Sequence, residues 1–450
     1  MLRRTVLTFL LASLVVAPLS AQHSEGGSGL RGRISDLFRF GNCAEPLCLN
    51  SSINSASGHG DHYIGSTVDG TNSLIGFLSG AIAQAVSSVP ISTATSGITF
   101  RIVGGVPEPT SSSAGPIFGE RVQTLGRGRV LIGANVTGVE FNSVRGVPLD
   151  NIAFNFTHQN VCRIGGPPPL PCGAPFPGDS ALGSPAFEND FIAVNTSLDL
   201  RMQVASLYFT YGLFDRVDIG IGVPFVRVDL RGGSLATVIP LTSPSPHFFG
   251  TAADPLLTAG ASMKGTETGM GDIAARVKVN LGGTDKGAIG ILTEARFPTG
   301  DEERFLGTGE TAIRVLGIAS ARYGTFSPHI NGGYLYRTGN SITDAILATV
   351  GFDQLISRRV TLAADFIGQF QVGTNPLVLP ESVRFTVPPL QRSLRPTNIP
   401  NRDDDIIDGS LGFKFLTGAG LTIVTNALVP LNNGGIRGNI VLTTGLEYNF

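Results

Sequence analysis

Residues 436–450 alternate between apolar and polar side chains with a period of two. One face of this segment carries Ile436, Gly438, Ile440, Leu442, Thr444, Leu446, Tyr448 and Phe450, and the other carries Arg437, Asn439, Val441, Thr443, Gly445, Glu447 and Asn449. A β-strand sends successive side chains to opposite sides, so this pattern predicts a strand with one apolar face.

The same alternation repeats along the C-terminal two-thirds of the chain. It predicts strands at 128–141, 199–212, 216–230, 271–282, 286–297, 310–323, 326–337, 345–355, 358–371, 408–417, 420–430 and 436–450. Tight turns alternate with longer connections, of which 142–198, 231–270 and 372–407 are the longest. Short turns at one end and long loops at the other are typical of membrane barrels. The sequence therefore predicts an all-β fold, a transmembrane antiparallel up-and-down β-barrel of about 12 strands (range 12–14) over residues 128–450.

Charged residues within these segments gather on one face. Asp272, Arg276 and Lys278 lie opposite an apolar face, and Asp365 lies opposite Phe366. A cation facing lipid at mid-membrane costs about 2–4 kcal/mol, so we expect the charged face to line an enclosed lumen. The residues expected to line the lumen are Asp272, Arg276, Lys278, Glu294, Arg296, Arg314, Asp365 and Lys414.

The N-terminal part of the chain differs from the strand region in composition and in its hydrophobic pattern. Arg3 and Arg4 precede an apolar run at 6–16 that ends in Pro18 and Ala21, which predicts a signal peptide at 1–21, with an uncleaved anchor as the alternative. Residues 22–127 are rich in Gly, Ser and Pro, and we expect them to form a plug or periplasmic segment. Their apolar stretch 74–86 predicts a short helix, either a small core helix or part of a plug inside the barrel.

Four cysteines form two pairs that are close in sequence, Cys43 with Cys48 and Cys162 with Cys172. In an exported chain this predicts local disulfides, although three connectivities are possible. The alternative, a zinc site, lacks a histidine at ligand spacing.

Composition and motifs argue against several other functions. The net charge of −2 does not suit a nucleic-acid-binding protein. His59 and His62 could begin a metal site, but a solvated loop is the simpler interpretation. A hydrolase using His329 with Ser320 or Ser327 would need a hydrogen-bonded third group that sequence does not reveal. The acidic runs 301–303 and 403–405 are interpreted as solvated loops, with cation-mediated contact to lipopolysaccharide as an alternative. We expect no enzymatic activity, cofactor or metal.

Short motifs in the strand region resemble a known family of outer-membrane transporters. The matching segments are Tyr211–Phe225 (YGLFDRVDIGIGVPF), Gly269–Lys278 (GMGDIAARVK), Arg296–Gly300 (RFPTG) and Asn331–Tyr336 (NGGYLY). Over about residues 120–450 they resemble the family called "MetA-pathway of phenol degradation", a relative of the long-chain fatty-acid and hydrocarbon (FadL-type) transporters. The final strand also resembles the C-terminal signal by which bacterial outer-membrane barrels engage the barrel-assembly machinery.

The resemblance implies a monomeric channel in the outer membrane of a Gram-negative bacterium, in contact with outer-membrane lipid and lipopolysaccharide. It implies passive uptake of small hydrophobic or aromatic compounds, with a general porin and a structural or adhesive barrel as alternatives. The expected ligand contacts are Leu74, Phe77, Leu78 and Ile82 in the plug and Phe385 in the long loop. Gly220, Gly222 and Pro224 predict a kinked strand, needed either for barrel curvature or for a lateral exit into the bilayer.

Overall fold

The structure is a computed structural model of the chain. It describes residues 29–38, 40–41, 47–51, 82, 100–103, 106–109, 114–157, 190–240, 247–284, 286–339, 342–375, 379, 382–387, 389–417 and 420–450. The expected signal peptide, the expected helix 74–86 apart from Ile82, and Cys43, Cys162 and Cys172 lie outside these residues.

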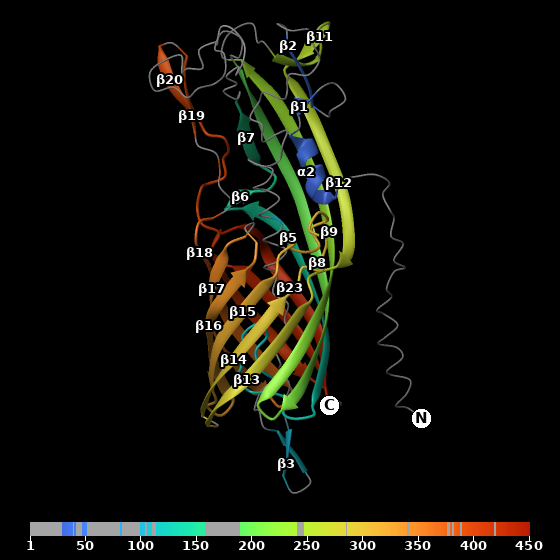
Figure 1. Ribbon diagram of the computed structural model, residues 1–450, viewed down its shortest axis with the longest axis vertical. Coiled ribbons are helices and arrows are strands. Elements are labelled where there is room, and N and C mark those ends of the chain that lie inside the picture. The colour runs from blue at the N-terminus through green and yellow to red at the C-terminus, as the bar shows by residue number, and fades with distance from the viewer. Residues whose placement is uncertain are drawn as a thin grey trace, which may run out of the picture.

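Twelve strands form a closed antiparallel barrel (Figure 1). In ring order they are β5 (Val130–Val144), β8 (Asp190–Phe214), β9 (Val217–Pro240), β13 (Ala274–Thr284), β14 (Gly287–Arg296), β15 (Ala312–Ala321), β16 (Phe326–Arg337), β17 (Asp344–Ser357), β18 (Val360–Val372), β21 (Ile406–Leu416), β22 (Leu421–Pro430) and β23 (Ile436–Asn449). The ring closes where β5 pairs with both β23 and β8. The predicted fold class and the number of twelve strands are confirmed.

The two ends of the barrel differ. At one end the backbone N–H of Val130 donates to the carbonyl of Phe450 at 2.9 Å, and the N–H of Phe450 donates back at 3.0 Å. The short connections β8–β9, β15–β16 and β17–β18 lie at the same end, which we call the turn end. A hairpin of β3 (Phe100–Val103) and β4 (Val106–Pro109) lies beyond the turn end (Figure 1). We call the opposite end, where the long connections gather, the loop end.

Side chains alternate between the barrel exterior and interior as the two-residue period predicts. On β13, Val277 and Leu281 are exposed, whereas Arg276 and Lys278 are buried. Aromatic pairs on the outer surface near the turn end include Phe413 with Phe415 and Tyr448 with Phe450. A ring of aromatic residues at the edge of an apolar band is the arrangement that membrane barrels place at a lipid–water interface.

Strands β8 and β9 contain 25 and 24 residues and continue past the barrel at the loop end (Figure 1). There β9 pairs with β12 (Thr258–Met270), and β8 pairs with β7 (Ile152–Phe156). We call the sheet β7–β8–β9–β12 beyond the rim the wall. The prediction that 142–198 and 231–270 are only connections is wrong, because they contain these strands. Polar residues on the outer side of the wall weaken the apolar alternation that identified the membrane strands.

A short helical stretch covers the inner side of the wall. It comprises α2 (Leu30–Ile34) and the 3-10 helix η1 (Ser35–Leu37), whose Leu30, Ile34 and Leu37 are fully buried. The hydroxyl of Ser234 on β9 donates to the carbonyl of Leu37 at 2.7 Å. Gly232 supports this close packing, because an added Cβ would lie 2.7 Å from Leu37 Cδ1.

Short strands complete the loop end. A small sheet contains β1 (Phe40–Gly41), β2 (Leu47–Ser51), β10 (His247–Thr251) and β11 (Asp254–Leu256), and β6 (Val147–Pro148) pairs with β5. A separate hairpin joins β19 (Val383–Val387) to β20 (Leu390–Leu394). Among the described residues, no helix is long and apolar enough to cross a membrane.

Two local expectations are corrected by the strand pairing. The register of β23 shifts between Arg437 and Val441, so Ile436 is buried although its sequence position places it on the apolar outer face. The ladder between β8 and β9 is continuous from Gly220 to Val226, and on the other side Pro224 accepts a hydrogen bond from Gly271 at 2.8 Å. The idea of a lateral exit at this kink is therefore wrong.

Candidate functional site

The half of the barrel interior nearest the turn end is occupied by residues 114–125, which we call the lumen segment. Its backbone N–H groups donate to side chains of strands spread around the ring. Ala114 bonds Thr361 at 3.0 Å, Glu120 bonds Asn331 at 2.8 Å, Val122 bonds Ser320 at 3.2 Å and Leu125 bonds Asp218 at 3.0 Å. Irregular backbone at membrane depth needs such partners because no water is available from the lipid side.

Adjacent residues of opposite charge fix the lumen segment to the barrel wall. Glu120 lies 3.2 Å from Arg276 and 3.5 Å from Lys278, both on β13. Arg121 lies 3.0 Å from Asp353 on β17. All five side chains are buried. Removing one member would leave a buried charge without its partner, so these pairs hold the segment in place.

Phe118 and Gly119, which we call the tip of the lumen segment, contact a histidine–aspartate pair. The N–H groups of Phe118 and Gly119 each donate to Asp365 Oδ2 at 3.4 Å, and Asp365 Oδ1 lies 2.7 Å from His329 Nε2. A Cβ on Gly119 would overlap His329, so only glycine permits this approach. The long N–H contacts make the tip the more weakly held part of the segment.

Further charge pairs line the same interior. Lys414 lies 3.5 Å from Glu447, which also accepts a hydrogen bond from Tyr208 at 3.1 Å. Tyr208 thus faces inward. Glu294 lies 2.8 Å from Arg314 and 3.6 Å from Arg296.

Asp272 lies where β12 gives way to β13, and it fixes the loop that follows β14. It accepts hydrogen bonds from the N–H of Gly300 at 3.0 Å and from the N–H and hydroxyl of Thr308, both at 2.9 Å. The loop buries Phe305, which has a positive φ of 57°, and contacts the N-terminal segment through a bond from Arg31 N to Glu303 O at 3.0 Å. Phe305 and Leu306 of this loop belong to the same hydrophobic cluster as Leu30 and Leu37 of the N-terminal segment.

Nearer the loop end, the interior is apolar along β22, β23, β5, β8 and β9, while Arg437 and Asp408 form a buried ion pair at the loop ends of β23 and β21. Buried residues of five neighbouring strands, Val139, Val204, Val226, Leu428 and Val441, belong to one hydrophobic cluster. The same cluster continues into the wall through Leu200, Val228 and Leu230 and reaches Leu30, Leu37, Phe154 and Ile82. We call this cluster the apolar interior.

Phe118 lies at the boundary between the two halves. It packs against the apolar interior on one side and against the small cluster of Ile117, Ala363 and Val424 on the other. The barrel therefore contains an apolar column above a charged layer, with an aromatic side chain of the lumen segment between them.

Sequence reasoning missed the lumen segment as a distinct element. Within 110–126, Glu120 and Arg121 are the only charged residues, directly before the first barrel strand. An isolated pair of opposite charges in an otherwise uncharged stretch was the available signal, because buried charges require partners.

Of the expected ligand contacts, Ile82 is buried in the apolar interior, and Phe385 lies in β19, where its side-chain environment is outside the described residues. Leu74, Phe77 and Leu78 are also outside them. Cys48 in β2 is not a free thiol, whereas the pairing of the four cysteines remains a prediction.

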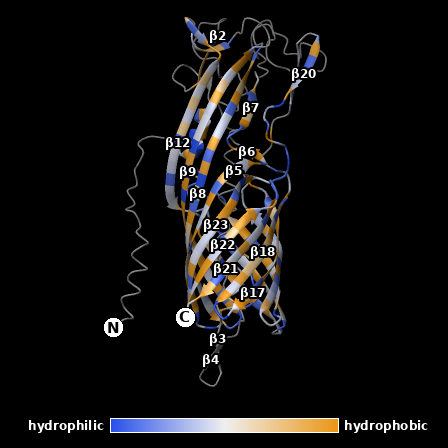
Figure 2. Ribbon diagram, turned by 180° about the vertical axis from the view of Figure 1, so that it is seen from behind, coloured by the Kyte–Doolittle hydropathy of each residue, from blue (hydrophilic) through white to orange (hydrophobic). Residues whose placement is uncertain are grey.

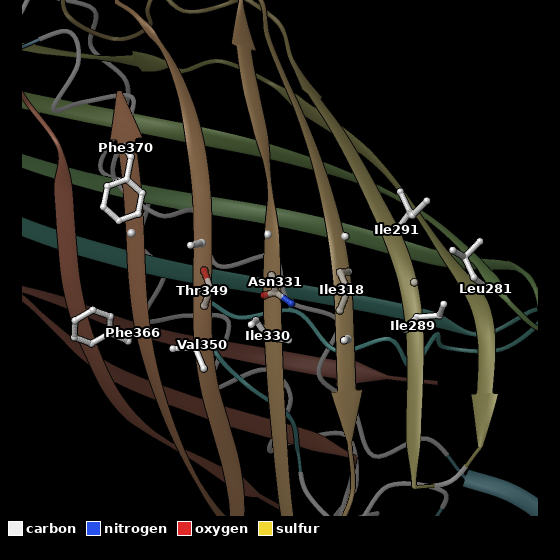
Figure 3. A pocket seen from close by; sticks show the side chains of 16 residues that line it. Leu281, Ile289, Ile291, Ile318, Ile330, Asn331, Thr349, Val350, Phe366 and Phe370 are labelled. Atoms are coloured by element: carbon white, nitrogen blue, oxygen red, sulfur yellow. The ribbon is translucent and has the colours of Figure 1, made fainter. Parts of the chain in front are cut away.

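A shallow groove of about 750 Å³ lies on the outer surface of the barrel (Figure 3). Its floor is a cross-strand row in which Gly317, Gly332, Ala348 and Gly368 are register partners. Exposed Ile289, Ile330, Val350 and Phe366 border it. Because this face is apolar and points away from the lumen, acyl chains of the bilayer would fill the groove.

The described residues form neither a metal site nor a catalytic triad. They contain no group of three or more side chains placed to hold a metal ion. His329 binds Asp365 through Nε2, and the Ser320 hydroxyl accepts from Val122 N, so no serine within this part of the chain is hydrogen-bonded to His329.

No family model and no curated protein matches the chain. Solved structures with a similar fold include an outer membrane channel from Pseudomonas putida F1 (11% identity, covering 73% of this chain and 98% of that one, TM-score 0.40). Another is the translocator domain of the autotransporter NalP from Neisseria meningitidis (9% identity, covering 73% of this chain and 91% of that one, TM-score 0.33). A third is the toluene transporter TbuX from Ralstonia pickettii (12% identity, covering 72% of this chain and 90% of that one, TM-score 0.26). At this identity the likeness concerns the fold alone.

Proposed function

We propose that this chain is an outer-membrane channel for passive uptake of small hydrophobic or aromatic compounds. A closed barrel with an apolar exterior and charged interior is a structure built to cross a lipid bilayer. The observation that carries the proposal is the apolar interior, which runs from the wall into the barrel and ends at Phe118.

Transfer of an apolar solute from water into such an interior is favourable by roughly 25 cal/mol for each Å² of apolar surface that is buried. It would enter from the loop end, move along the apolar column and meet Phe118 above the charged layer. Passage to the turn end then requires displacement of the lumen segment, whose weakest contacts are the 3.4 Å bonds from its tip to Asp365.

The charged layer also distinguishes this proposal from a general porin. A porin keeps an aqueous lumen, whereas here Glu120 and Arg121 bridge the interior between β13 and β17. We expect low ion conductance from the purified barrel and faster entry of apolar solutes into cells that contain it.

Two measurements, one on the purified protein and one on cells, test the proposal. Conductance would be recorded in planar lipid bilayers, and uptake would be compared between a deletion strain and the complemented strain over a panel of alkanes, aromatics and fatty acids. Low conductance with faster uptake of at least one apolar class supports the proposal. Steady conductance of small ions without any effect on apolar uptake would identify a porin instead.

A matched pair of substitutions sharpens the test. Val441→Thr places a hydroxyl in the apolar interior, whereas Val136→Thr places the same group on the exposed outer face of β5. A buried hydroxyl without a partner costs about 1–3 kcal/mol, so uptake of apolar solutes should fall only for Val441→Thr. Equal uptake by both variants would contradict the assigned route.

A further inference from the structure

The outward residues of the wall change from apolar to charged just beyond the barrel rim. Figure 2 shows hydrophilic positions along β8, β9 and β12 in this region. Strand pairing aligns the outward residues in rows across β5, β8, β9 and β12. The row nearest the barrel is Val136, Ala205, Phe225 and Met270, and the next is Gly138, Gln203, Arg227 and Thr268. The third row is Glu140, Arg201, Asp229 and Thr266, and the fourth is Asp199, Arg231 and Lys264.

The position of this change matches a membrane boundary. On β9 the outward residues from Ile219 to Phe225 are apolar and the next, Arg227, is charged. The nine residues from Val217 to Phe225 extend about 27 Å along the strand. At a strand tilt of about 35–45° this is about 20 Å along the membrane normal, near the apolar band of about 25 Å that membrane barrels present to lipid. The charged rows therefore lie at the level of the lipid headgroups on the loop-end side.

Most charges in these rows are neutralised by neighbours. Arg227 lies 3.0 Å from Asp229, and Thr266 donates to the same carboxylate at 2.5 Å. Arg201 lies 3.1 Å from Asp199 and 3.4 Å from Glu140. Each carboxylate in the charged rows, which we call the outer patch, is therefore paired with an arginine.

Arg231 and Lys264 are different. They are direct register partners on β9 and β12, and both are exposed. Arg231 also lies opposite Asp199 on β8 and lowers the pKa of Asp229 by its charge, but no salt bridge joins either cation to a carboxylate among the described residues. Like charges directly opposite each other on one face of an antiparallel pair are destabilising. An anion bound between the two cations would remove this repulsion, and guanidinium and ammonium groups are the side chains that bind phosphate.

We propose that Arg231 and Lys264 form a binding site for the phosphate groups of lipopolysaccharide in the outer leaflet. The site holds one glycolipid phosphate against the wall and keeps β9 and β12 aligned beyond the rim. This inference rests on the outer-membrane placement in the proposed function, and is independent of which solute the barrel transports.

The test uses the full-length protein in detergent with EDTA, so that bound divalent cations do not bridge carboxylates to phosphate. The probe is rough lipopolysaccharide carrying its lipid A and inner-core phosphates, and binding is measured by native mass spectrometry. The double variant Arg231→Gln/Lys264→Gln should weaken binding by about tenfold or more, as expected for the loss of two charge-assisted contacts.

The control is Arg358→Gln/Arg359→Gln, which removes two exposed cations at the turn end. It should leave binding unchanged, and dephosphorylated lipopolysaccharide should bind the unaltered protein as weakly as the phosphorylated form binds the Arg231/Lys264 variant. Unchanged binding in that variant, equal losses in both variants, or equally strong binding of phosphatidylglycerol would overturn the proposal. Apolar uptake measured on the same variants separates this outcome from failure of the channel function, because the outer patch does not touch the apolar interior.

Discussion

Arg121 Nη1 lies 3.0 Å from Asp353 Oδ2, and both side chains are buried inside the barrel. The neighbouring residue Glu120 makes the opposite contact, to Arg276 and Lys278 on β13. Two consecutive residues of the lumen segment are thereby attached to strands on different sides of the ring. This cross-bridge spans the turn-end half of the lumen.

Breaking that bridge should open the barrel to ions. Asp353→Asn leaves Arg121 buried without its counter-charge, a change that typically costs about 3–5 kcal/mol. We expect a lower thermal unfolding temperature and the appearance of ion conductance in planar bilayers. The matched control is Glu140→Gln, which breaks the exposed pair with Arg201 and should cost about 0–1 kcal/mol without altering conductance. If the Asp353→Asn variant still conducts no ions, the Arg121–Asp353 pair is not what prevents conductance.

Gly119→Ala should displace the tip of the lumen segment. The added methyl group would overlap His329 and Asp365, so the tip must move away from this pair. The expected results are greater ion leakage and reduced stability. Gly332→Ala is a suitable control, since its added Cβ meets nothing within 4 Å on the outer face. Similar behaviour of the two alanine variants in the conductance assay would argue against a tightly fitted tip.

The barrel strands could be predicted from sequence because lipid imposes a strict rule on each outward residue. Val277 and Phe366 must be apolar, while Lys278 and Asp365 can be charged only if they face inward. Beyond the rim this constraint ends. Arg227 and Asp229 can then occupy outward positions of β9, and the alternation that marks a membrane strand disappears although the strand continues.

The site was less predictable because its contacts join residues far apart in the chain. Phe118 packs against the cluster that contains Val424, which is far away in sequence. The isolated charges Glu120 and Arg121 are the one local signal that 114–125 is buried, and they do not identify the strands that partner them. The expected ligand contacts were instead placed on 74–82, where apolar residues are dense in sequence. Sequence period identifies which side of a strand a residue occupies, but it does not identify what fills the space enclosed by twelve strands.

Asp404 should be essential for anchoring the long loop at the loop end. Its carboxylate binds Arg145 through two 2.7 Å contacts, both side chains are buried, and it also accepts from the N–H of Gly435 at 2.9 Å. Sequence reasoning treated the run 403–405 as solvated, which is wrong for Asp404. Asp404→Asn should destabilise the protein by about 3–5 kcal/mol, measured by denaturant unfolding. Asp403→Asn, at an exposed neighbouring position, should have little effect. A similar unfolding midpoint for both variants would contradict the anchoring role.

Asp229 gives the wall a pH dependence whose sign follows from its surroundings. The hydrogen bond from Arg227 lowers the pKa of this carboxyl below its ordinary value of 3.8. The stabilisation is therefore complete above that ordinary value and is lost as the pH falls through the lowered one. The stability difference between the unaltered protein and Asp229→Asn should be constant at neutral pH and disappear in strong acid, as followed by urea unfolding. A difference that stays the same from neutral pH into strong acid would rule out ionisation of Asp229 as its source.

Substitution of Phe118 should weaken solute binding without breaking the ion pairs of the lumen segment. Its ring packs against the apolar interior, whereas Glu120 and Arg121 make the ion pairs. Phe118→Ala would remove apolar contact area worth about 1–2 kcal/mol to a bound solute, which corresponds to a rise of about 5–30-fold in the concentration that half-saturates uptake.

Conductance of this variant should stay low, because both ion pairs remain. The control Phe366→Ala removes the same ring from the lipid-facing side of β18, where 52% of the residue is exposed, and should leave uptake unaltered. Equal half-saturation for Phe118→Ala and the unaltered protein would mean that solutes do not reach the floor of the apolar interior. Equal impairment in both variants would instead point to a general loss of barrel stability.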